Sequence, residues 1–252
     1  GALTSGNSTA DASPMGAVGG TNAADNWADD VQLLPFTLAQ ADPFANVTAP
    51  TPTGCQKFSD YDTGNNNKPG GVLDLTSQTG VVCIKENGGN PPTLNIQGDV
   101  KLGSATYVLD ATSLKMTNAG AKLSCTGCTI ILTSSTAATD GSSIGTVDLS
   151  GGTLNLTSPE SGPYKGISIY QDRRAVTGAT NKINGNNLSS LEGAFYFPKQ
   201  ELEFTGTSGV EFKCVQMVAW TVKFSGTSDV TNDCDVPGGG QSFAGQAVRL
   251  VE

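Results

Sequence analysis

The sequence predicts an all-β protein whose strands coil into a right-handed parallel β-helix, a solenoid with about 20 residues in each turn. Three observations predict this fold: the composition, short apolar stretches between turn residues, and an internal repeat. Glycine accounts for 32 of the 252 residues and charged residues for only 15%, below the roughly 25% of ordinary globular domains. Such a composition is typical of short strands joined by many turns.

From about residue 72 onward, apolar and polar residues alternate in short stretches. Pairs of the form apolar-x-apolar begin at Leu94, Leu114 and Leu154, and similar pairs continue to about residue 230. Alternation with a period of two places one side chain toward a core and the next toward solvent. We therefore expect Leu154 and Ile167 to point inward and Glu201 to point outward.

The internal repeat brings the same pattern back at a fixed spacing. Residues 204–214 and 224–234 share the pattern F-[ST]-G-T-S-x-V-x-x-x-C, and Leu94, Leu114 and Leu154 lie at multiples of the same spacing. One turn of a parallel β-helix has about this length, its turns stack roughly 4.8 Å apart, and the right-handed sense is the default for parallel crossovers. A two-sheet β-sandwich is the alternative, but it is not expected to show such a period.

Two regions are predicted: residues 1–40 as a flexible leader or cap, and residues 41–252 as one β-helix domain with an N-terminal linker. The leader is rich in small and polar residues, apart from several apolar residues at 27–38. Because the ends of a β-helix expose unpaired strand edges, we expect either residues 27–38 or a partner subunit to cover one of them. Removing residues 1–40 is then expected to lower stability or cause aggregation.

The chain contains six cysteines, and an even number in a chain of this composition suggests an oxidising compartment. Cysteines at the same repeat position one turn apart would lie about 4.8 Å apart, inside the roughly 4.4–6.8 Å Cα separation of disulfides. A zinc site at the Cys-x-x-Cys sequence is the alternative, but it lacks a second ligand pair and the chain has no histidine. We predict the disulfides Cys214–Cys234, Cys125–Cys128 and, by elimination, Cys55–Cys83.

Several function classes are disfavoured. The net charge of −9 argues against nucleic acid as a partner, because binding it needs clustered basic residues. Residues 141–145 match the G-x-S-x-G pattern of hydrolases, but without a histidine there is no base for the serine. No cofactor and no metal are predicted, and the only local cluster of opposite charges is at 172–174. A β-helix carbohydrate-active enzyme, with clustered carboxylates, is the enzymatic alternative.

Several segments resemble one known family. They are SGPYKGISIYQDR at 161–173, NKING at 181–185, LEGAFYFP at 191–198, VRLVE at 248–252 and ADPFA at 41–45. In their residues and in their order along the chain, these segments resemble the TadG-like proteins of the bacterial Tad (Flp, type IVc) pilus machinery. The resemblance covers residues 40–252. The residues that carry the resemblance best are Gln171, Asp172, Arg173, Tyr196 and Pro198.

The resemblance implies a non-enzymatic component of a bacterial surface appendage, acting in pilus biogenesis or surface attachment. The expected location is extracytoplasmic: periplasm, cell surface or secreted. Expected partners are other appendage subunits, including further copies of itself, and a glycan or surface receptor. Such proteins usually begin with a hydrophobic anchor, so membrane contact is expected only through a segment absent from this chain. The alternative outside the pilus setting is a glycan-binding adhesin that acts without pili.

Overall fold

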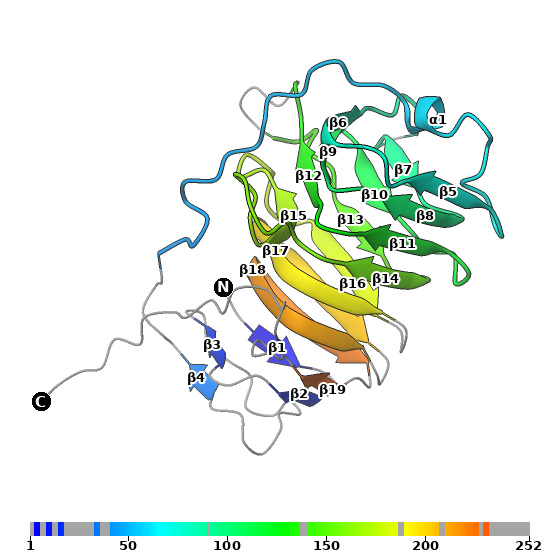
Figure 1. The fold of residues 1–252 in the computed structure, drawn as a ribbon. Coiled ribbons are helices and arrows are strands. Elements are labelled where there is room, and N and C mark those ends of the chain that lie inside the picture. The colour runs from blue at the N-terminus through cyan, green and yellow to red at the C-terminus, as the bar shows by residue number, and fades with distance from the viewer. Residues whose placement is uncertain are drawn as a thin grey trace, which may run out of the picture.

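The fold is seen in a computed structural model (Figure 1), which describes residues 3–5, 9–11, 15–17, 33–35, 41–89, 91–136, 141–185, 189–206, 210–226 and 229–231. Fifteen strands form one sheet that coils into about six turns, and all the pairs between its strands are parallel. The only helix among the described residues is α1 (Phe58–Tyr61). The predicted parallel β-helix is therefore confirmed.

Each of the first four turns contributes one strand to each of three faces. The first face holds β5 (Val72–Leu75), β8 (Asp99–Leu102), β11 (Lys122–Cys125) and β14 (Thr153–Leu156). The second face holds β6 (Gly80–Ile84), β9 (Ala105–Asp110), β12 (Thr129–Thr133) and β15 (Ile167–Gln171). The third face holds β7 (Thr93–Asn95), β10 (Ser113–Lys115), β13 (Val147–Leu149) and β16 (Thr180–Gly185). The long strands β17 (Ser190–Gly206) and β18 (Glu211–Gly226) continue through all three faces.

The core is a set of apolar columns that run along the axis of the solenoid. Alternate side chains of each strand point inward, and parallel pairing in register places each on the equivalent side chain of the next turn. On the first face, one column consists of Leu73, Val100, Leu123 and Leu154, which pair in that order and are at most 5% exposed. The inward position of Leu154 is therefore confirmed.

The length of a turn is less regular than predicted. The predicted spacing is found where Leu94 pairs with Leu114 and where Phe204 pairs with Phe224. Leu154, however, pairs with Leu123, and the separation of these two residues along the chain is not a multiple of the predicted spacing. The longer turns carry their extra residues at the corners, where additional chain does not disturb the pairing of the strands.

A column of alternating charges runs along the outside of the third face. The backbone register places in one row Lys115, Asp148, Lys182, Glu203 and Lys223. Glu203 is 4.0 Å from Lys182 and 3.2 Å from Lys223, measured from carboxylate oxygen to Nζ. Such exposed pairs contribute little stability each, but a shift of one strand along its neighbour would separate them. The column therefore favours one register of the stack.

Segments from before the solenoid lie at both of its ends. At the first turn, Phe58 of α1 is buried in the apolar core, and Tyr61 donates a hydrogen bond to the carbonyl of Cys83. At the last turn, β1 (Leu3–Ser5) adds a parallel strand to the edge of β18 at residues 222–224. Figure 1 shows this N-terminal strand beside the orange strand β18. The leader thus supplies an edge strand.

The cover differs in detail from the prediction, which assigned it to residues 27–38 or to a partner subunit. Of these, the structure describes only 33–35, which lie in β4 (Leu33–Pro35), paired with β3 (Met15–Ala17) in a separate two-stranded sheet. A second small sheet joins β2 (Thr9–Asp11) to β19 (Asp229–Thr231). Trp27 lies outside the described residues.

Deleting residues 1–40 is expected to free the edge of β18 and to promote self-association, because an open strand edge pairs readily with another chain. Size-exclusion chromatography with light scattering would measure the fraction of higher oligomers. A variant lacking only residues 1–8 should behave similarly, since it too loses β1. Monomers of unchanged stability in both variants would contradict the capping role.

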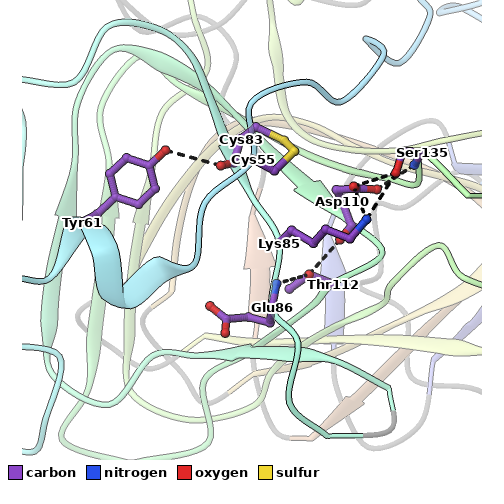
Figure 2. The surroundings of a disulfide bond; sticks show 8 residues. All are labelled: Cys55, Tyr61, Cys83, Lys85, Glu86, Asp110, Thr112 and Ser135. Carbon is purple, nitrogen blue, oxygen red and sulfur yellow. Dashed lines mark hydrogen bonds and ion pairs between the residues drawn. A yellow bond between two sulfur atoms is a disulfide. The ribbon is translucent and has the colours of Figure 1, made fainter.

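Two of the three predicted disulfides are present. Cys55 is bonded to Cys83 and Cys125 to Cys128. The first joins the linker to β6 of the first turn (Figure 2), close to an ion pair between Lys85 and Asp110. The second closes the corner between β11 and β12. Cys214 is buried in β18, but Cys234 lies outside the described residues, so the third pairing stays a prediction.

Non-reducing peptide mapping by mass spectrometry is expected to recover Cys214 linked to Cys234. The physical reason is the register of the last described turns, in which Phe204 and Phe224 are partners in adjacent turns. The two cysteines have the same separation along the chain as these two phenylalanines. A free thiol at either position, or a link from Cys214 to another cysteine, would show that the repeat does not continue past β18.

Candidate functional site

The linker lies as a strap, here residues 42–52, across the outside of the second face. Figure 1 shows this blue segment running along the solenoid from the side of β18 toward the first turn. Beneath it, register aligns the outward column Cys83, Val108, Ile131, Tyr170 and Tyr196. Cys55, just after the strap, is bonded to the first member of this column, and Phe44 packs edge-on against the last, with ring centroids 5.4 Å apart. The strap thus covers an apolar outer surface.

Arg173 holds the strap by both charge and hydrogen bonds. Its Nη2 and Nε atoms lie 3.0 and 3.1 Å from Oδ2 of Asp42, a charge-assisted contact that is stronger than a neutral hydrogen bond. Its Nη1 donates to the carbonyl of Val47 at 2.6 Å, and its Nη2 also donates to the carbonyl of Phe44. One side chain therefore binds the strap at Asp42, Phe44 and Val47.

Tyrosines form the floor of the same contact. The rings of Tyr170 and Tyr196 are stacked with centroids 4.9 Å apart, and the guanidinium carbon of Arg173 lies 5.2 Å from the centroid of Tyr196, within the range of a cation–π interaction. The hydroxyl of Tyr196 donates to Asp42 at 2.7 Å and that of Tyr170 to the carbonyl of Val47 at 2.9 Å. We call Asp42, Phe44, Tyr170, Arg173 and Tyr196 the latch.

The electrostatics of the latch favour the ion pair. Burial raises the pKa of Asp42, but hydrogen bonds from Tyr196, the Phe44 amide and Arg173 outweigh it, so the pKa lies below the ordinary value. Burial is also the main cause that raises the pKa of Tyr170, to about 12, and that of Tyr196. At neutral pH, Asp42 is therefore ionised and both tyrosines are protonated donors.

The latch is expected to weaken in acid. Since the pKa of Asp42 is lower in the folded state than the roughly 3.9 of an unfolded chain, its stabilisation is complete above about pH 4 and is lost as the pH falls through the folded value. Asp42→Asn should cost about 1 kcal/mol at pH 7, a modest effect because the side chain is 35% exposed. Urea unfolding at pH 7 and pH 3 should show this difference shrinking; a constant difference would contradict it.

Gln171 has a different role from its neighbours in the sequence. It is completely buried and its amide nitrogen donates to Oε1 of Gln200 at 2.8 Å and to the carbonyl of Gly145 at 3.0 Å. Asn181 donates to the same Gln200 oxygen at 2.9 Å. These amides form a buried polar network between the second and third faces. Gln200 was not predicted, because a glutamine beside a charged stretch gives no sequence signal of burial.

The remaining motif residues also lie apart from the latch contacts. Asp172 is buried and binds Arg174 at 2.6 Å and the hydroxyl of Thr133 at 2.7 Å. Pro198 lies where the register between β17 and β18 shifts. Among the predicted residues, the structure thus brings Arg173 and Tyr196 into direct contact, while the other three shape the neighbouring corners.

Ile167 was predicted to point into the interior of the solenoid, and this prediction is wrong. It is completely buried, as expected, but it belongs to the outer apolar cluster with Phe44, Tyr164 and Tyr170 and not to the interior column. The prediction failed because every residue of β15 is buried, on both sides of the strand. The strap that covers the outer side comes from a much earlier part of the chain, so no local alternation marks it.

A groove follows the corner between the first and second faces. Its volume is about 630 Å³, and it crosses five successive turns, with lining residues that include Gly80, Ser104, Thr126, Thr157 and Glu192. One wall is the loop between β14 and β15, which contains Glu160 and Tyr164. Tyr164 donates to the carbonyl of Thr48 in the strap at 3.0 Å, so this wall is held in place.

Neither a metal centre nor a membrane-spanning helix is found in the described residues. Within that part of the chain, no group of three or more acidic or cysteine side chains is placed to hold a metal ion. No helix there is long and apolar enough to cross a lipid bilayer.

Comparison with known proteins found no matching family model, no matching curated protein and no matching solved structure. Conclusions about function therefore depend on the residues themselves.

Proposed function

We propose that the protein is a non-enzymatic, extracytoplasmic component of a bacterial surface appendage of the Tad type, acting in pilus biogenesis or surface attachment. The proposal assigns it no cofactor and no catalytic residue. Its partners are other appendage subunits, including further copies of itself.

The observation that carries the proposal is the latch. Three of the segments that resemble TadG-like proteins, at 41–45, 161–173 and 191–198, meet in it, although Asp42 is 131 residues from Arg173 and 154 from Tyr196. Segments 161–173 and 191–198 meet because β15 and β17 pair in adjacent turns, whereas segment 41–45 reaches both of them from outside the solenoid through Asp42. Their contact supports reading them as parts of one structural unit.

The two disulfides support the extracytoplasmic location. Disulfides form and persist in oxidising environments such as the periplasm and the cell surface. Cys55–Cys83 ties the linker to the first turn, and Cys125–Cys128 closes a corner of the solenoid. Purification from a periplasmic fraction with both bonds intact would agree with this location.

The residue best placed to contact another subunit is Trp220. It is 61% exposed on β18, and tryptophan is enriched at protein interfaces, because its large apolar ring and its N–H group can both be used by a partner. Ala219 and Thr221 beside it pair with residues that flank the register shift at Pro198. We therefore include Trp220 in the proposed subunit contact.

The test is a clean gene deletion that is complemented with variants. Loss of pili or of surface attachment is expected in the deletion strain, with recovery by the wild-type gene, and immunogold labelling should place the protein at the appendage. Trp220→Ser should fail to restore assembly, whereas Val176→Ser, at an apolar residue that is 39% exposed, should restore it. Normal pili and normal attachment in the deletion strain would refute the proposal.

A glycan-binding adhesin that acts without pili is the second candidate, because the corner groove offers a polar surface across five turns. Attachment that survives the loss of all other pilus genes would favour it. A β-helix carbohydrate-active enzyme would instead release reducing ends from a polysaccharide, an activity that the proposal does not expect.

A further inference from the structure

The corner groove has the shape of a site for an extended molecule. Five turns at a spacing of about 4.8 Å give it a length of roughly 19 Å along the axis. Its floor is made of turn residues that repeat from coil to coil, and its volume of about 630 Å³ falls within the range of ligand sites.

The groove is preorganised by hydrogen bonds that leave its hydroxyl oxygens able to accept a further bond. The hydroxyl of Ser104 donates to the carbonyl of Thr126 at 3.0 Å, and that of Thr157 accepts from the amide of Gly127 at 2.9 Å. In the wall, the amide of Gly166 donates to the carbonyl of Pro159 at 2.9 Å. A site that is already ordered loses little entropy when a ligand binds.

The charges of the groove are all of one sign. Glu160 and Glu192 both line it, and its lining contains no lysine or arginine. The pKa of Glu192 is raised, mainly by burial; Lys213 acts in the opposite direction, and the charge of Glu160 adds to the rise. A partly buried carboxylate whose pKa is raised in this way gains from a ligand that donates to it.

We propose that this groove binds a glycan chain that carries free amino groups, with its ammonium groups at Glu160 and Glu192 and its hydroxyls along the threonine- and serine-lined floor. Hydroxyl-rich ligands suit this floor, because it offers small polar side chains, and the apolar surface that Pro159, Pro163 and Tyr164 give to the wall suits the faces of sugar rings. An anionic polysaccharide would be repelled. The proposal goes beyond the appendage role, since a purified protein can bind such a glycan whether or not pili exist.

Isothermal titration calorimetry of the full chain would test this with a glucosamine hexamer, its fully N-acetylated form, an oligogalacturonate and hexalysine. We expect the glucosamine hexamer to bind most tightly and the oligogalacturonate not at all. The double variant Glu160→Gln/Glu192→Gln should bind the glucosamine hexamer roughly tenfold more weakly or worse, as expected for the loss of a charge-assisted contact. Glu201 lies on the third face, outside the groove, so Glu201→Gln should leave the affinity for the hexamer unchanged.

A second variant, Thr126→Trp, should block the groove by bulk at an exposed turn position, and thermal melting would verify that each variant is folded. Four results would overturn the proposal: no binding of the glucosamine hexamer, equal binding by the double glutamine variant, equal or tighter binding of the oligogalacturonate, or equally tight binding of hexalysine. The last would mean that the groove accepts cationic chains in general.

Discussion

Leu154→Asp is expected to lower the free energy of unfolding by several kcal/mol and to abolish folding at physiological temperature in the worst case. The side chain is completely buried in the first-face column, where Leu123 is its partner in the preceding turn. The substitution removes apolar burial and places a charge without a partner in a low-dielectric interior. Urea unfolding followed by circular dichroism would measure the loss.

Glu201→Ala is the matched control for this prediction. Glu201 points outward on the third face, where its carboxylate accepts a hydrogen bond from the hydroxyl of Thr180, at 3.2 Å. We expect a change within about 0.5 kcal/mol, the usual range for surface substitutions. If both variants unfolded at the same urea concentration, the assignment of inward and outward sides would be wrong.

Arg173→Ala should release the strap. The variant loses the contacts to Asp42 and to the carbonyls of Val47 and Phe44, and leaves Asp42 without its cation. We expect a loss of about 2 kcal/mol, within the range for hydrogen bonds to charged groups. Chymotrypsin offers a local measurement, because Phe44 is only 6% exposed and cleavage after it requires the strap to open.

Cleavage after Phe44 should be several-fold faster in Arg173→Ala than in the wild type. Lys182→Ala is the control, since it removes a basic side chain from the third face, 4.0 Å from Glu203, without touching the strap. Cleavage at the wild-type rate in Arg173→Ala, in a protein shown to be folded, would mean that the tyrosines and the disulfide at Cys55 hold the strap without Arg173.

The fold class could be predicted from sequence because its cause is local and repeated. Each short strand carries its own inward and outward pattern, as in Leu94 with Ile96, and the spacing from Leu94 to Leu114 corresponds to one turn. The same spacing does not hold where a corner contains more residues, as in the turn before Leu154. Extra corner residues change the distance between partners along the chain but not the pairing of the strands.

The candidate site could be predicted only in part. Resemblance pointed to Arg173 and Tyr196, which the latch contains, but no pattern in the sequence connected them to Asp42. No pattern in the sequence indicated the corner groove. Its lining is spread from Gly80 to Glu192, and small polar turn residues are common throughout this chain.

The sequence by itself determined that the chain forms strands of alternating polarity that stack in parallel, since period-two patterns and corner glycines act within a few residues. It also predicted the pairing of Cys125 with Cys128 and, by elimination only, that of Cys55 with Cys83, and both bonds are present. Only the tertiary structure decided which outward surface is covered. Stacking of the turns brings the members of the charge column within contact distance. The latch depends in addition on the path of the strap, which reaches Arg173 and Tyr196 from a segment before the solenoid.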